Sequence, residues 1–146
     1  MQGSVATETI AAGFLQAAMV AQVRELASRD REVRAHEQAH AAVGGAHAGT
    51  PHFQYERGPN GVSYAVEGHV NIDVSEVPGD PSATLEKMQT VRRAALVPAN
   101  PSPADRAVAA KATLRAAQAR AELADSRRVD ISDAEGTKGG YVDITL

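Results

Sequence analysis

The stretch His36-Glu37-Gln38-Ala39-His40 governs the interpretation of this chain of 146 residues. On a helix, side chains four residues apart lie on one face about one turn from each other, so His36 and His40 can bind one metal ion. Glu37 follows the first histidine and can reach a water on that ion. The pattern H-E-x-x-H is typical of zincin-type metalloproteases, in which it supplies two zinc ligands and a general base.

The residues around the motif predict a helix from residue 31 to residue 43. Gly44-Gly45 supplies its C-terminal end, because glycine readily adopts the left-handed conformation of a helix cap. A second helical pattern covers residues 7–26. Residues 28–30 either separate the two helices or lie on the polar face of one. The helical stripe near the motif consists of Val33, His36, Glu37, His40 and Val43.

Residues 52–74 predict a β-hairpin, or a three-stranded meander if the chain bends at Gly68. The turn is indicated by Asn60-Gly61, a strong hairpin signal. Asp80 and Pro81 then predict the start of a helix that ends before Pro98.

A further helix is expected from Pro103 to about Asp125. Its predicted buried residues are Val108, Ala112, Leu114 or the stem of Arg115, Ala117 and Ala121. Together these patterns predict an α+β, mainly helical fold, a minimal zincin-like domain. We expect a single domain at residues 1–125 and a flexible C-terminal tail at residues 126–146.

The composition limits which side chains could bind a metal and which partners are expected. The chain contains no cysteine, so any zinc must be held by His, Asp or Glu. The net charge of −3 gives no reason to expect a nucleic-acid partner.

No run of about 18 apolar residues predicts a membrane span. No positive charge precedes the apolar N-terminal region, so no signal peptide is expected and the cytoplasm is the favoured compartment. Oligomeric state and substrate preference do not follow from the sequence.

A catalytic zinc site needs a third protein ligand besides His36 and His40. The extended pattern H-E-x-x-H-x-x-G-x-x-H fits imperfectly, because Gly44 and His47 each fall one residue late. Several other side chains are open as candidates: His52, Glu67, His69, Asp73, Glu76 and Glu86. His69 has the best local setting, since it follows Gly68 at a possible bend, whereas Glu86 would be a glutamate on a downstream helix.

Five segments of the chain resemble the SprA-related family of bacterial metalloproteases. They are residues 30–40, 58–61, 64–73, 92–98 and 101–110, and the likeness covers about residues 29 to 124. The resemblance implies a zinc peptidase acting on a peptide or protein substrate. The family's activity is itself inferred largely from the H-E-x-x-H pattern.

The resemblance also singles out one position. This chain has Glu67-Gly68-His69-Val70 where the family usually has Gly-Gly-Glu-Val, so His69 stands in place of a glutamate. Both residue types bind zinc, which implies that His69 is the third ligand.

These inferences define one expected mechanism and two alternatives. His36, His40 and His69 are expected to hold Zn²⁺, with Glu37 as the general base and Tyr64 as a candidate to stabilise the oxyanion. The first alternative is a structural zinc in a domain that binds a partner. The second is a metal-free helical interaction module.

Overall fold

The computed structural model describes the backbone of residues 2–144 and the side chains of residues 5–129. Its described residues form three α-helices, one short 3₁₀ turn and one two-stranded antiparallel sheet, which confirms the α+β, mainly helical fold. The elements are α1 (Gln2–Gly44), η1 (Gly45–His47), β1 (His52–Arg57), β2 (Ser63–His69), α2 (Pro81–Leu96) and α3 (Pro103–Ile144).

Contacts within the chain group its residues into two compact units. The motif unit comprises Met1–Ala42 and Ala48–Asn71, and the helical unit comprises Val43–His47 and Ile72–Leu146. The single domain expected over residues 1–125 stays a prediction.

Helix α1 is continuous through the segment where the sequence left a break open. Asp30 lies within this helix on the side that faces β2. Its carboxylate accepts a hydrogen bond from Nε of Arg34, one turn further on, at 3.0 Å. The helix ends at the glycine pair, where Gly45 has a φ of 54°. A left-handed residue directly after the last helical turn is the expected helix end.

Strands β1 and β2 form a hairpin whose turn is closed by backbone hydrogen bonds from Gly58 to Val62 and from Gly61 to Gly58. Gly61 has a φ of 78°, which explains the glycine at this position. The register changes beside Gln54, where Val66 is an extra residue on β2 and forms a bulge. The sheet of the described residues has two strands, so the three-stranded meander is not formed.

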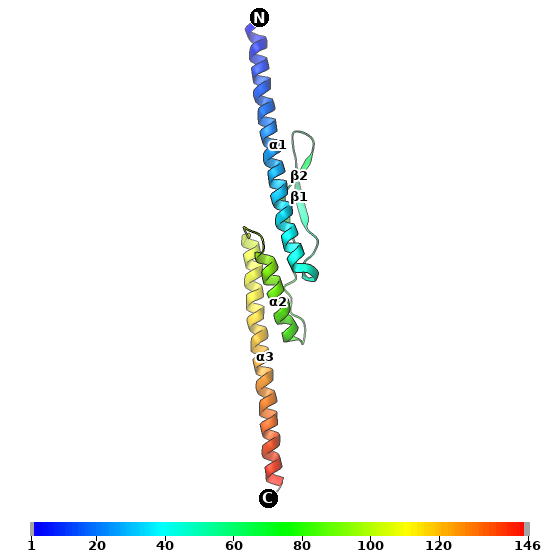
Figure 1. Cartoon of the computed structure of the whole chain (residues 1–146), viewed down its shortest axis with the longest axis vertical. Coiled ribbons are helices and arrows are strands. Elements are labelled where there is room, and N and C mark those ends of the chain that lie inside the picture. The colour runs from blue at the N-terminus through cyan, green and yellow to red at the C-terminus, as the bar shows by residue number, and fades with distance from the viewer. Residues whose placement is uncertain (1, 145–146) are drawn as a thin grey trace. The chain divides into compact units, whose positions relative to one another are not determined.

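The hairpin lies along α1 (Figure 1), and side chains of the helix bind the backbone of β2. The carboxylate of Asp30 accepts a hydrogen bond from the N–H of Ala65 at 2.8 Å. Nε of Arg29 donates to the carbonyl of Val66 at 2.7 Å. These bonds satisfy polar groups that an edge strand would otherwise present to solvent.

In the helical unit, α2 and α3 form an antiparallel pair (Figure 1). As predicted, Asp80 caps α2, accepting a hydrogen bond from the N–H of Ala83, and the helix ends before Pro98. Ser102 and Asp105 cap α3 reciprocally, each side chain accepting from the other's backbone N–H. The core of the pair consists of Met88, Val91, Ala112 and Ala116, with Ile72, Val74, Leu85 and Val108 packed against it.

The expected buried face of α3 was partly wrong. Leu114 is 61% exposed, whereas Arg115, the alternative at this place, is half-buried. Ala117 and Ala121 are exposed. The buried alanines are Ala109, Ala112, Ala116 and Ala119. The helix also continues to Ile144, through most of the segment that the sequence assigned to a flexible tail.

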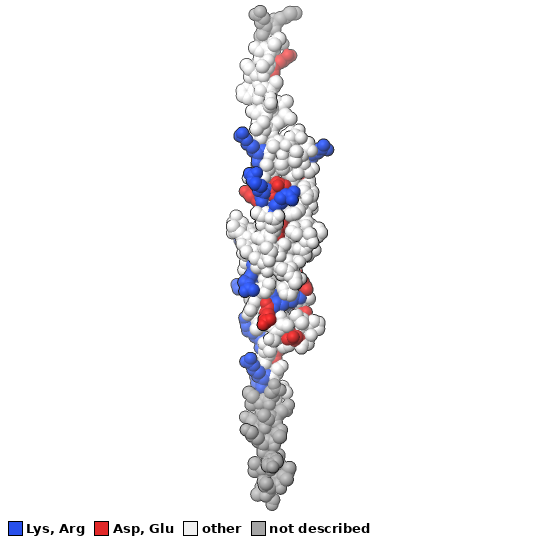
Figure 2. Space-filling view, turned by 45° about the vertical axis from the view of Figure 1, so that its right-hand side comes forward, with Lys and Arg blue, Asp and Glu red and all other residues white. Residues whose placement is uncertain are grey.

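The N-terminal part of α1 is poor in charge. Glu8 is the one charged residue between residues 5 and 23, and Figure 2 shows this part of the helix almost wholly white. Its exposed large apolar side chains are Val5, Ile10, Phe14, Leu15, Met19 and Val20. No helix in the described part of the chain is both long enough and apolar enough to cross a membrane.

Candidate metal centre

Helix α1 brings His36 and His40 together as the sequence predicted. Their ring centroids lie 4.8 Å apart in an edge-to-face arrangement. His36 is partly buried, whereas His40 is only 2% exposed and its Nε2 atom is buried. Two imidazoles one helical turn apart are the donor class that zinc accepts. The pair therefore fits a zinc ion as two of its ligands.

Glu37 lies under the hairpin and is 6% exposed. A Cβ atom added to Gly68 would come within 2.7 Å of Cγ of Glu37, so the backbone of β2 packs directly on the stem of this side chain. The same added atom would lie 3.0 Å from the ring of Phe53. Gly68 thus permits a close approach between strand and helix, and this approach holds Glu37 in place beside the two histidines.

His69 is not brought to His36 and His40. Gly68 faces α1, and adjacent residues of a strand point to opposite faces, so His69 lies on the outer face of the hairpin. Its ring is exposed and stacks on that of His52, its partner in the register, with centroids 5.1 Å apart. For His69 to reach an ion held by α1, the end of β2 would have to rotate.

Within the described part of the motif unit, no third His, Asp or Glu is close enough to share one ion with the pair. Glu67 is exposed and lines a pocket with Glu25 and Arg29 of α1, about two to three helical turns before His36.

The remaining candidates belong to the helical unit. Asp73 forms an ion pair with Lys87 at 2.8 Å. His47 lies in η1, where its carbonyl accepts a hydrogen bond from the N–H of Asp73. Glu76 and Glu86 are exposed. The identity of the third ligand stays a prediction.

Tyr64 lies at the turn of the hairpin. Its hydroxyl accepts a hydrogen bond from Nδ2 of Asn60 at 2.7 Å, and its ring packs beside Gly58. It lies four positions before Gly68 in β2, a separation of about 13 Å at the rise of a strand. This position gives Tyr64 a structural contact at the turn and offers no support for an oxyanion role at Glu37.

Two residues that position the site were not expected from the sequence, Asp30 and Gly68. The hydrogen bond from the Ala65 N–H, together with Arg34, holds the pKa of Asp30 below its usual value, and partial desolvation opposes this effect. Arg34 in turn lies over the ring of Phe53, 5.2 Å from its centroid. This contact joins the middle of α1 to β1.

The fold and the site place the chain in a class: a helical protein with an H-E-x-x-H helix covered by a β-hairpin. The chain belongs to the SprA-related family, which it matches over residues 6–139. A search of curated proteins and a search of solved structures find no match.

Proposed function

We propose that this protein is a zinc-dependent peptidase whose general base is Glu37. The observation that carries the proposal is the arrangement on α1: the rings of His36 and His40 adjoin, and Glu37 is held beside them under β2. The third zinc ligand is left open. His69 is the ligand that the family resemblance favours.

Zinc held by His36 and His40 would supply Lewis-acid chemistry, which polarises a peptide carbonyl and makes a water more acidic. The carboxylate of Glu37 takes the proton of the attacking water and delivers it to the leaving amide nitrogen. The backbone of β2 limits the conformations of Glu37, so its carboxylate is positioned before the substrate arrives.

The hairpin also suggests how a substrate would be held. Asp30 and Arg29 already bind the backbone of β2 at Ala65 and Val66. An extended peptide would therefore pair with the outer edge of β1, adding a strand to the sheet.

The direct test is hydrolysis of an unfolded protein such as casein by the zinc-loaded wild type and by Glu37→Gln. The exchange removes the base but leaves both histidines, so we expect equal zinc content and a loss of rate of at least about 100-fold. Glu32→Gln, an exposed change on the same helix, is the matched control and should keep full activity. Undiminished hydrolysis by Glu37→Gln would exclude this mechanism.

A structural zinc in a binding module is the second candidate. It is favoured by the small apolar core of the motif unit. Among the described residues of this unit, the buried apolar side chains are those of Leu26 and Ala65. A zinc ion would then add the stability that a small core lacks. In that case zinc removal would lower the melting temperature, and neither wild type nor Glu37→Gln would hydrolyse casein.

A further inference from the structure

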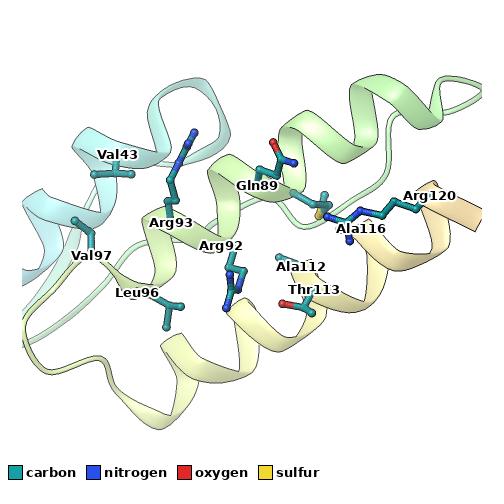
Figure 3. Close-up of a pocket in the computed structure, with 11 residues that line it drawn as sticks. Val43, Gln89, Arg92, Arg93, Leu96, Val97, Ala112, Thr113, Ala116 and Arg120 are labelled. Carbon is teal, nitrogen blue, oxygen red and sulfur yellow. The ribbon is translucent and has the colours of Figure 1, made fainter. Parts of the chain in front are cut away.

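A groove of about 900 Å³ runs between α2 and α3 in the helical unit. It takes no part in the proposed zinc chemistry. The residues that line the groove extend over about 12 Å along the axis of each helix, since an α-helix rises about 1.5 Å per residue. The groove is lined by Val43, Met88, Gln89, Arg92, Arg93, Leu96, Val97, Ala112, Thr113, Ala116 and Arg120 (Figure 3).

The floor of the groove is apolar. Ala112 and Ala116 of α3 are buried, and their short side chains leave open space beside Met88 of α2. Towards the end of α2, Leu96 and Val97 are 38% and 43% exposed. A ligand on this floor would therefore cover apolar surface that now faces water, which favours binding.

The rim of the groove is positively charged. Figure 3 shows Arg92 pointing from α2 towards α3, and Arg120 reaching from α3 towards α2. Arg92, Arg93 and Arg120 are all exposed. None of them pairs with a carboxylate in the described part of the chain, and Arg93 donates a hydrogen bond to the hydroxyl of Thr90 at 3.3 Å. Three arginines thus line one concave apolar surface, and among the described residues no carboxylate is paired with them.

We propose that this groove binds an acidic peptide segment of a partner protein, with apolar side chains on the floor and carboxylates at the arginines. Guanidinium groups bind carboxylates through paired hydrogen bonds, and an amphipathic helix in an apolar groove is a common mode of peptide recognition. The concave shape argues against a lipid bilayer, which would meet the rim and leave the floor unfilled.

Fluorescence anisotropy of the full chain with a labelled amphipathic peptide tests the proposal. The peptide carries leucine on one face and glutamate on the other over about 12 residues, roughly three helical turns. One comparison peptide has lysine in place of glutamate, and another has serine in place of leucine. We expect the acidic amphipathic peptide to bind at least tenfold tighter than either comparison peptide. Its affinity should fall as salt is added, because salt screens the attraction between its carboxylates and the arginines.

Variants then locate the binding. The double variant Arg92→Glu/Arg120→Glu should bind the acidic peptide at least tenfold more weakly than the wild type. Lys111→Glu, an exposed change on α3 outside the groove, should leave the affinity unchanged. Leu96→Ser should also weaken binding of the acidic peptide. Leu114→Ser, which changes an exposed leucine outside the groove, is the apolar control and should not. Circular dichroism checks that each variant is folded.

Three results would overturn the proposal: equal binding of the lysine peptide, full affinity in the double arginine variant, or binding to phosphatidylglycerol vesicles without binding to the acidic peptide. None of these results depends on casein hydrolysis, so the groove proposal and the zinc-peptidase proposal are tested independently of each other.

Discussion

At Gly68 the backbone of β2 packs directly against the side chain of Glu37 on α1. An added Cβ would overlap Cγ of Glu37 at 2.7 Å and press on the backbone carbonyl of His52 at 3.2 Å. Neither atom is the far end of a flexible side chain, so either the strand or Glu37 must move. The position of the proposed general base, Glu37, thus depends on the absence of one methyl group at residue 68.

Gly68→Ala should therefore lower casein hydrolysis by at least about tenfold, because small displacements of a catalytic group are costly. Zinc content should stay unchanged, since neither histidine is touched. Gly49→Ala is the matched control, as its added Cβ would lie 3.6 Å from the nearest atom. Equal activity of Gly68→Ala and wild type would show that β2 does not position Glu37.

Local spacing was enough to predict that His36 and His40 share one face, because both lie on one regular helix. The direction of His69 could not be predicted in the same way. The bulge at Val66 shifts the alternation of β2, so that Ala65 and Gly68 both meet α1 and His69 points outward. A one-residue irregularity of this kind leaves no mark in the pattern of apolar residues.

At the level of elements, the hairpin is held to α1 by a contact between residues 35 positions apart in the chain. The carboxylate of Asp30 accepts from the N–H of Ala65 at 2.8 Å and also binds Arg34. Ala65 itself is fully buried. The sequence indicated Asp30 only as part of a possible helix break or of a polar helix face, since a bond to a distant backbone group has no local signal.

Asp30→Ala should loosen this contact. A hydrogen bond to a charged acceptor contributes about 1.5 to 3 kcal/mol, so the amide of Ala65 should exchange its hydrogen at least about tenfold faster. Amide exchange followed by NMR measures this directly. Glu32→Ala, an exposed change two residues away, should leave the exchange unaltered. Unchanged protection of Ala65 in Asp30→Ala would mean that other contacts hold the hairpin.

In the helical unit, an ion pair joins the segment before α2 to the helix itself. Nζ of the buried Lys87 donates to the carboxylate of Asp73 at 2.8 Å and to the hydroxyl of Ser75 at 3.2 Å. The hydrogen bonds from Lys87 and Ser75 hold the pKa of Asp73 well below its usual range. The carboxylate is half exposed, which limits its contribution to stability.

Asp73→Asn should lower the free energy of unfolding by about 1 kcal/mol near neutral pH, because Lys87 loses its charged acceptor. Since the folded-state pKa is depressed, the unfolded chain takes up the proton first as the pH falls. The advantage of the wild type is therefore full above about pH 5 and shrinks as the pH falls below the ordinary pKa of about 3.9.

Guanidinium unfolding at several pH values measures this difference. Glu76→Gln, an exposed change nearby, is the control and should behave as the wild type does. A difference that stayed constant down to low pH would contradict the ion-pair account.

For the whole molecule, composition and caps predicted the architecture well. Asp80, Pro81 and Pro98 mark the ends of α2 by local chemistry, and Asn60-Gly61 marks the hairpin turn. The buried face of α3 was harder to predict, because alanine is common all round this helix and gives no clear apolar stripe. A third ligand for the proposed zinc site could not be predicted for a related reason: it would depend on tertiary placement and not on spacing within one element.

The zinc content of the purified full chain, compared with that of His40→Ala, shows directly whether the two histidines of α1 hold a metal ion. His40 is buried beside His36, so we expect about one zinc per wild-type chain and almost none in the variant. Gln38→Ala, an exposed change within the motif, should bind zinc as the wild type does. A wild-type chain that stays metal-free in excess zinc, or a variant that keeps its full complement, would contradict the claim.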